Sequence, residues 1–517
     1  MIFITQLVFA QEPIDDTMAR PIQNRSKMIP FIQLDGKKSA TPIYRQIYEA
    51  IRQSILRGEF TVGMHLPPTR SLAQQLGVAR MTVVNAYEQL FAEGYVEGKQ
   101  GSGTRVATTL PDEMLRVREE KVFQNKESAK PRKLILSRRG RWLSSTITPI
   151  RPRPEGSPDA FQYGMPAVDE FPFKLWSQLA SRRMKNPPRE LLAYGDPAGY
   201  LPLRTGIASH LKTARAVHCD AEQIIIVAGA QQALDLIARV LLDPEDRAWI
   251  EDPGYAGARN SFLFAGAKVA HVSVDREGFD LTGAIKRYKS ARLVYVTPSH
   301  QFPLGITMSL SRRLALLEWA KRSDAFIIED DYNSEYRYAG RPLASLQGLD
   351  RDGRVIYVGT FSKTIFPSLR LGCIVVPKDL TSAFIAARGL VDWHSPSLDQ
   401  ATLADFISEG HFARHIRRMR TLYKERQEIL VTAARRELEG LMEVAPAEAG
   451  MHLVGWLPKY VNDKTASEKA KRHGIVAAPL SAFSANKLPR AGLVLGYTGV
   501  NSKQIKDGVK RLAKALS

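Results

Sequence analysis

Cysteine is scarce in this chain: two residues, Cys219 and Cys373, occur among 517. Two cysteines cannot form a disulfide framework or a four-cysteine zinc site, so we expect no metal and a reducing, cytoplasmic setting. Long apolar runs are also missing, because no segment approaches the 18 uninterrupted apolar residues of a membrane helix. The sequence therefore predicts a protein without a membrane partner.

The first residues give a weak targeting signal. Residues 2–10 are apolar, as in the core of a signal peptide, but no basic segment precedes them and they are too few to span a membrane. We interpret residues 1–38 as an N-terminal arm, with Met18 and Met28 as alternative starts.

Charge is strongly biased toward one sign. The net charge of +20 predicts a polyanionic partner, most simply double-stranded DNA, although a solvated basic surface is the alternative. Residues 39–107 hold seven basic and five acidic residues, a net of +2, whereas residues 130–153 hold eight basic residues and no acid. We interpret residues 108–155 as a basic linker. Phosphate contacts and simple solubility explain its charge equally well.

Residues 39–107 have the pattern of a winged helix-turn-helix. Apolar residues recur at helical spacing up to Gly58. After two prolines, Thr69 is expected to cap a second helix that runs to Leu76, and a third helix covers about residues 79–93. Two short strands around a glycine-rich tip follow. Six residues are expected in the core of this head: Leu72, Leu76, Val83, Val84, Tyr87 and Leu90.

The start of the third helix is the expected DNA-reading element, because such a helix enters the major groove with its N-terminus first. Arg80 can reach a phosphate or a guanine, and Thr82 a phosphate or a thymine methyl group. Arg70 is placed for backbone contact. Gly103, in the wing tip, allows a close approach to the minor-groove face.

Residues 156–517 alternate between strand and helix patterns, which predicts an α/β domain with a mostly parallel, doubly wound sheet. A long basic helix is expected at Met419–Leu438, within a smaller α+β subdomain near the C-terminus. The expected strands are Gln223–Ala228, Ala248–Glu251, Lys268–Val272, Leu293–Thr297, Phe326–Glu329, Arg354–Tyr357 and Cys373–Val376.

Lys363 and Asp330 suggest a pyridoxal phosphate site, because this cofactor needs an amine that forms an imine and a carboxylate that keeps its ring nitrogen protonated. Asp331 is the alternative carboxylate. The phosphate is expected against hydroxyls, an arginine fork and a helix N-terminus. These elements are Thr360, Ser362, Arg370, Gly229, Ala230 and Gln231.

Four further side chains are candidates for contacts with the cofactor ring. Tyr332 could donate to its phenolic oxygen, which His300 or Gln301 could also reach, and Tyr255 is placed to stack on the ring. For Tyr255 and His300, packing in the core or in a loop is equally compatible with the pattern.

These motifs resemble known families. Residues 42–106 resemble the GntR-type winged helix, including Leu66-Pro67-Pro68-Thr69-Arg70-Ser71-Leu72-Ala73, and residues 160–517 resemble a fold-type I, class I/II aminotransferase. Together they resemble the MocR/GabR-like regulators. The resemblance implies pyridoxal 5'-phosphate and a head-to-tail, domain-exchanged homodimer in which Tyr194 contacts the cofactor phosphate of the neighbouring subunit.

Two departures from these families bear on function. Many GntR members carry arginine where Val84 or Asn85 stands here, which shifts base reading toward Arg80 and Thr82. Val494 stands where aminotransferases often carry the arginine that clamps the substrate carboxylate. The ligand is then an amine, or it is clamped elsewhere, with Arg259 and Arg490 as candidates.

The function implied by the resemblance is transcription regulation, with a small amine or amino acid sensed through external aldimine formation. The alternative is an active aminotransferase with a vestigial DNA-binding head. We expect no dedicated enzyme, although residual transaminase activity is compatible with Lys363.

Overall fold

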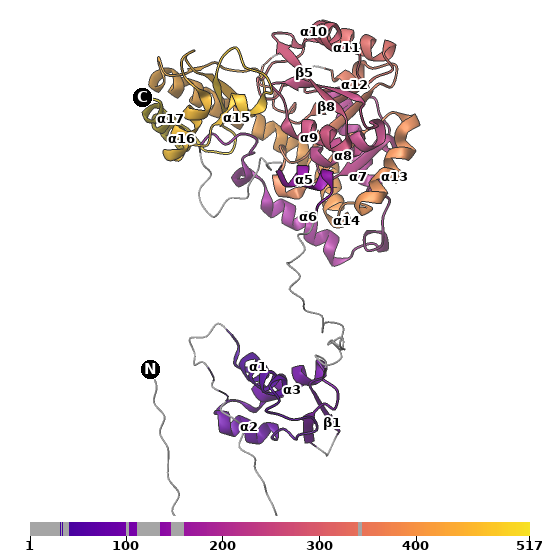
Figure 1. The fold of residues 1–517 in the computed structure, drawn as a ribbon, viewed down its shortest axis with the longest axis vertical. Coiled ribbons are helices and arrows are strands. Elements are labelled where there is room, and N and C mark those ends of the chain that lie inside the picture. Colours follow the sequence, from indigo (N-terminus) through magenta and orange to yellow (C-terminus); the bar gives the residue numbers. More distant parts are fainter. Residues whose placement is uncertain are drawn as a thin grey trace, which may run out of the picture. The chain divides into compact units, whose positions relative to one another are not determined.

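The structure is a computed structural model that describes residues 32, 34, 41–99, 103–110, 135–145, 160–339 and 344–517. The expected arm, apart from residues 32 and 34, and wing-tip residues 101–102 lie outside the described ranges. The chain divides into two compact units, Met1–Ile135 and Leu136–Ser517. Figure 1 colours the first indigo and the second from purple to yellow.

The first unit consists of three helices and a two-stranded antiparallel ribbon. Its elements are α1 Ile43–Leu56, α2 Thr69–Leu76, α3 Arg80–Ala92, β1 Val96–Lys99 and β2 Gly103–Val106. Their apolar sides share one core. The sequence prediction is confirmed for Leu72, Val83, Tyr87 and Leu90, which are buried, whereas Leu76 and Val84 are half-buried.

The start of α2 differs from the prediction. Thr69 is the first helical residue, Pro68 precedes the helix, and no described side chain caps it. The expectation that Thr69 is the cap was therefore wrong. Pro68 has an extended backbone (φ −55°, ψ 140°), and its carbonyl accepts from the Leu72 amide at 3.0 Å, so the helix begins one residue earlier. The turn expected at its end is present, with Gly77 at φ 66°.

The second unit is built on an eight-stranded sheet with the order β3-β10-β9-β8-β7-β4-β5-β6. The pairs β4–β5, β4–β7, β7–β8 and β8–β9 are parallel, and β10 is antiparallel to both neighbours. All seven expected strands are present. The bounds are β3 Ile224–Val227, β4 Arg247–Asp252, β5 Lys268–Asp275, β6 Gly278–Phe279, β7 Leu293–Val296, β8 Phe326–Asp331, β9 Val355–Thr360 and β10 Gly372–Val375.

Helices cover both faces of this sheet (Figure 1). Neighbouring strand residues enter different cores: Ile328 packs in one apolar cluster and Ile327 in another. Burial on both faces explains why the strands read as continuous apolar runs. The helices are α6 Phe173–Lys185, α7 Leu201–Arg215, α8 Ala230–Leu241, α9 Ala256–Ala265, α10 Leu281–Tyr288, α11 Leu310–Arg322, α12 Leu346–Leu349, α13 Thr381–Asp392 and α14 Ser397–Ser408.

The predicted α+β subdomain is present near the C-terminus. Its four-stranded sheet has the order β11-β12-β14-β13, with antiparallel pairs throughout. The long helix α15 begins at His411, eight residues before the predicted Met419. The elements are α15 His411–Glu437, β11 Glu443–Val444, β12 His452–Trp456, α16 Asp463–Arg472, β13 Ala478–Pro479, β14 Gly492–Gly496 and α17 Ser502–Leu516. Within the described ranges, no helix has the length and apolar character that a membrane span requires.

One helix lies inside the range expected to be linker. Helix α5, Arg138–Ser145, belongs to the second unit. Its Trp142 ring stacks on Phe264 of α9 at 6.3 Å between centroids, and the Arg139 guanidinium lies 6.0 Å from the same ring. Arg141 donates to the carbonyl of Leu136 at 2.7 Å. Part of the basic run therefore contacts protein.

The docking of α5 on α9 gives a first prediction. Phe264→Ala removes the ring that Trp142 and Arg139 contact, so trypsin should cleave after Arg138, Arg139 and Arg141 several-fold faster than in the wild type. Mass spectrometry of timed digests measures this. Leu263→Ala, at a 40% exposed neighbour on α9, is the matched control. Equal rates in all three proteins would show that α5 is not held by Phe264.

Candidate functional site

The strand register brings distant motifs to one edge of the large sheet. Gly372, at the start of β10, pairs with Thr360 at the end of β9 and with Val227 at the end of β3. Lys363 follows Thr360, and Gly229 follows Val227, so both lie at this edge. The backbones approach closely, because a Cβ on Gly372 would lie 3.0 Å from the Cα of Gly229. The carboxyl ends of such strands are the usual binding edge of an α/β sheet.

An anion site is formed where α8 begins. Gly229 precedes the helix with φ 106°, a conformation that favours glycine, and leaves the amides of Ala230 and Gln231 in the first turn. A Cβ on Gly229 would lie 3.4 Å from Nη1 of Arg370, so the guanidinium lies against the same turn. Thr360 accepts through Oγ1 from the Ser362 amide at 3.2 Å. A helix N-terminus beside an arginine fork suits a phosphate.

The two adjacent carboxylates at the end of β8 have different partners. Asp331 accepts from Arg215, Tyr357 and Ser334 at 2.7–2.8 Å. Asp330 accepts through Oδ2 from the Tyr295 hydroxyl at 2.7 Å, but its buried Oδ1 has no hydrogen-bond partner among the described residues. Burial raises the pKa of Asp330 to about 7, and the neighbouring Asp331 charge adds to this. Oδ1 of Asp331 also lacks a described partner, but Asp331 already pairs with the Arg215 cation, so Asp330 is the carboxylate left for a cationic ligand.

Lys363 lies close to Asp330. Its Nζ donates to the carbonyl oxygen of Gly164 at 2.8 Å. Burial lowers the pKa of Lys363 to about 8, while the Asp330 charge acts in the opposite direction. Gly164 has φ 75°, and a Cβ there would lie 2.9 Å from Nζ, so a larger residue would crowd the amine. The fold therefore provides a lysine that loses its proton readily.

Aromatic groups surround this lysine and carboxylate. The Tyr332 hydroxyl lies 2.9 Å from Nδ1 of His300, and burial lowers the pKa of His300 to about 3, so this ring is neutral. Tyr255 precedes α9, and its hydroxyl donates to the Gln231 side chain at 3.2 Å. Burial raises the pKa of Tyr255 to about 12, with a further contribution from Asp330.

Gln301, the alternative to His300, forms hydrogen bonds with other groups. The Gln301 amide donates to the carbonyls of Pro253 and Phe302 at 2.8 and 2.6 Å and to Glu251 at 3.3 Å, so it ties the loop together. Tyr194 does not join the other candidates in this chain, since its side chain is 92% exposed.

The head presents its expected contact residues to solvent. Arg80 is the first residue of α3 and is exposed, Thr82 is half-buried one turn into the helix, and Arg70 is exposed near the start of α2. Gly103 begins β2 with φ 78° and is exposed. The start of α3 therefore carries polar side chains over a buried apolar face.

Known proteins share both units. Residues 43–106 match the gntR family of bacterial regulatory proteins, and residues 169–512 match aminotransferase class I and II. The probable rhizopine catabolism regulatory protein MocR of Rhizobium meliloti is 43% identical, over 92% of this chain and 94% of that protein. The HTH-type transcriptional regulator TauR of Rhodobacter capsulatus is 32% identical, over 92% and 96%.

This chain belongs to the MocR-type transcriptional regulators. Its second unit also has the fold of the α-aminoadipate aminotransferase LysN from Thermus thermophilus, solved with N-(5'-phosphopyridoxyl)-L-leucine. The TM-score is 0.64 at 30% identity, over 69% of this chain and 91% of that one. The MocR-type chain therefore binds DNA through its GntR head and has pyridoxal phosphate as its cofactor.

The residues present in this MocR-type protein fit that cofactor. The unpartnered Oδ1 of Asp330 would hold the protonated ring nitrogen, and the start of α8 with Arg370 would hold the phosphate. Lys363 and Tyr255 would lie at the aldehyde and the ring. When bound, pyridoxal phosphate supplies an aldehyde that condenses reversibly with primary amines and a ring that withdraws electrons.

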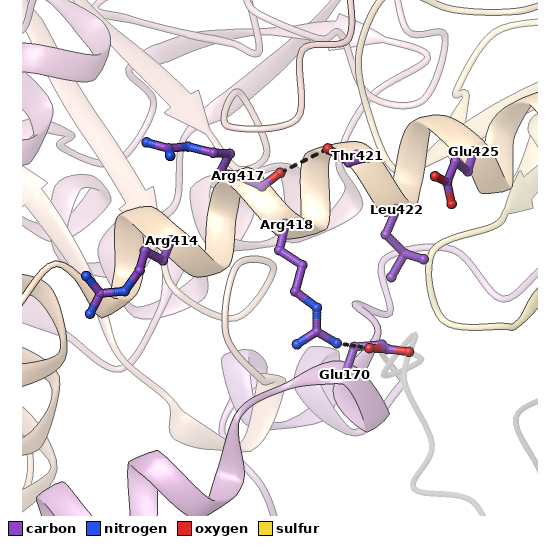
Figure 2. A pocket seen from close by; sticks show the side chains of 7 residues that line it. All are labelled: Glu170, Arg414, Arg417, Arg418, Thr421, Leu422 and Glu425. Atoms are coloured by element: carbon purple, nitrogen blue, oxygen red, sulfur yellow. Dashed lines mark hydrogen bonds and ion pairs between the residues drawn. The ribbon is translucent and has the colours of Figure 1, made fainter.

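A separate hollow, along helix α15, does not fit pyridoxal phosphate. Three arginines and two glutamates line a 480 Å³ hollow along α15, where Arg418 forms an ion pair with Glu170 (Figure 2). Thr421 donates to the Arg417 carbonyl on the same helix at 3.4 Å. Among the described residues that line this hollow there is no lysine and no aromatic ring, so these residues cannot form the covalent and stacking contacts that the cofactor needs.

Sequence reasoning missed several groups at the site. Tyr295, which bonds Asp330, stands on β7 in an ordinary apolar run, and Gly164 reaches Lys363 across 199 residues of sequence. Tyr163, Phe302 and Phe483 form a connected aromatic group, with ring centroids 5.1–5.7 Å apart. Of these, Gly164 had a local signal, as a glycine next to aromatic Tyr163 ahead of helix α6.

The lowered pKa of Lys363 gives a second prediction. The amine must be uncharged to react, and its neutral fraction rises about tenfold per pH unit below the pKa. Covalent capture of pyridoxal phosphate by the cofactor-free protein should therefore accelerate with pH and level off above about pH 8, not 10.5. Stopped-flow absorbance measures the rate. Lys363→Ala should give no borohydride-reducible adduct, and a midpoint near 10 would contradict the buried amine.

Proposed function

We propose that this MocR-type regulator changes its DNA binding when a small primary amine or amino acid reaches the Lys363 site. The supporting observation is that the unpartnered oxygen of Asp330, the Lys363 amine and the anion site at Gly229 lie together in a chain whose head exposes Arg80. Regulation then follows from differential binding, because a ligand shifts an equilibrium only between states that it binds unequally.

Each side chain has a distinct task in this proposal. Asp330 stabilises the positive charge of the ring nitrogen, and Arg370 fixes the phosphate end. Lys363 would hold the aldehyde of the cofactor, and the carbonyl of Gly164 accepts a hydrogen bond from its free Nζ. Tyr255 and the neutral His300–Tyr332 pair bound the ring without adding charge.

The proposed assembly is a homodimer in the cytoplasm. Large apolar side chains are exposed beside Tyr194, and exposed apolar groups of this kind favour a protein partner. Leu192 and Leu390 are 68% and 89% exposed, and Trp393 donates to the Gly195 carbonyl at 3.0 Å. This supports a partner-facing Tyr194 that reaches the second subunit's cofactor phosphate. The DNA-binding head and two free cysteines support a reducing cytoplasm.

Coupling between the two units is the test of the proposed function. A DNA fragment selected from a random pool with the full-length protein serves as operator. Its Kd, measured by fluorescence anisotropy at fixed salt, should change about fivefold or more when a ligand that alters the cofactor absorbance is added. Lys363→Ala should keep operator binding but lose this response. An equal response in Lys363→Ala, or none in the wild type with a ligand bound at the cofactor, would contradict the proposal.

The head gives a separate prediction. Arg80→Ala should weaken binding to the selected operator by roughly 10- to 100-fold, because a direct guanine contact contributes about 1–3 kcal/mol of discrimination. The cofactor spectrum should not change. Arg57→Ala, at the C-terminal end of α1, also removes one positive charge from the head and is the matched control. If both variants lose affinity equally, Arg80 contributes only general charge.

A further inference from the structure

Val494 lies in an apolar wall and not in a polar clamp. It is fully buried on β14, opposite Val454 of β12 in the sheet register. Both belong to a cluster with Leu480, against which further apolar side chains pack. These are Tyr163, Leu304, Trp456, Ala478, Phe483 and Leu488. A carboxylate brought to this wall would lose its hydration without gaining a cation.

The same wall continues to the Lys363 site. Gly496, two residues after Val494 and so on the same face of β14, packs against the segment that ends in Gly164, since a Cβ on Gly496 would lie 2.6 Å from the Cα of Tyr163. Gly164 in turn accepts from Nζ of Lys363. The ring of Tyr163 lies 5.7 Å from that of Phe302.

Phe302 completes the connection between the apolar wall and the cofactor side. Its ring lies 6.3 Å from Tyr255 and 6.1 Å from Tyr332. Phe483 is fixed from the other direction, because its carbonyl accepts from the amide of Gly254, next to Tyr255, at 2.9 Å. A ligand whose amine reaches Lys363 would therefore direct its substituent toward apolar and aromatic groups.

Among the candidate replacements for the missing clamp, Arg490 is engaged, Arg276 is exposed and Arg259 is half-buried on α9 beside Asn260. Arg490 donates to Glu443 at 2.8 Å and to the Leu457 carbonyl at 3.1 Å. Arg259 lies on α9 with its Nε 3.4 Å from Asn260. Arg276 lines a 380 Å³ hollow beside the wall, but it is exposed in the turn between β5 and β6, where water screens its charge.

We infer that the effector is a primary amine with no carboxylate on the carbon that bears the amine, and that Val494 and the aromatic group Tyr163, Phe302 and Phe483 select an apolar substituent. This rests on the proposed function and narrows its ligand class. The missing charge-assisted contact predicts a preference for the amine over its parent amino acid of roughly 10- to 100-fold.

Matched ligand pairs test the inference. The purified protein with its cofactor is titrated with phenethylamine against phenylalanine and with 3-methylbutylamine against leucine, at fixed pH. Cofactor absorbance and the thermal midpoint both report binding, so no turnover is needed. In each pair the amine should bind at least tenfold more tightly. Equal or tighter binding of the amino acids would overturn the inference but leave amine sensing intact.

Two variants test the role of Val494 directly. Val494→Arg should bind the amino acid of each pair more tightly and so reduce the difference in affinity between amine and amino acid. Val494→Met introduces a side chain similar in size to arginine but without its charge, and it should leave that difference unchanged. Position 494 is buried, so if Val494→Arg does not fold, the wild-type pairs decide the matter alone. If no member of either pair binds while borohydride still traps the cofactor on Lys363, this inference fails, whereas the proposed function is decided separately by the operator-binding response.

Discussion

Two neighbouring carboxylates on one buried strand impose the main electrostatic constraint on the effector domain. Successive strand side chains point to opposite faces, so Asp330 and Asp331 enter different surroundings. Asp331 meets Arg215 of α7 at 2.7 Å, with both side chains almost fully buried. Burial lowers the pKa of Arg215, but the charges of Asp331 and Glu329 and the hydrogen bond to Asp331 together outweigh it and raise that pKa. A buried charge without a partner destabilises a protein strongly, so this ion pair fixes α7 against the sheet.

Asp330 has no arginine partner among the described residues, and the cofactor can provide the positive charge that the protein does not. Its Oδ2 has a neutral partner in Tyr295, while Oδ1 has none among the described residues. With a pKa raised to about 7 by burial, the group is only partly ionised at neutral pH until a cationic ring nitrogen lies beside it. Binding of the cofactor to the folded state alone then stabilises the whole domain. The same local electrostatics thus join stability to cofactor recognition.

The parts that sequence reasoning predicted are those with a local signal. Runs such as Ile224–Val227 are apolar on both faces and identify strands, and Lys363, Asp330 and Arg370 each stand just after or before such a run. The choice between Asp330 and Asp331 was not available from the sequence, because it depends on Arg215, 116 residues away from Asp331. Thr69 was misplaced because the sequence pattern does not show which of two adjacent residues has helical backbone.

The aromatic group beside the site and the docked helix α5 were missed for the same physical reason. Tyr163, Phe302 and Phe483 come from three distant segments of the chain, and none has a periodic pattern that marks it as part of a site. Helix α5 is short and basic and reads as linker, because the ring that holds it belongs to α9.

That contact has a structural consequence for signalling. Tyr255 begins α9 beside the cofactor residues, and Phe264 lies near its other end, under Trp142 of α5. One ten-residue helix therefore connects Tyr255 to α5, a described helix near the start of the second unit. A packed helix moves as a unit because its backbone hydrogen bonds and its buried face resist bending. Tyr255 and α5 are thus linked through a single packed helix, without a longer chain of side-chain contacts.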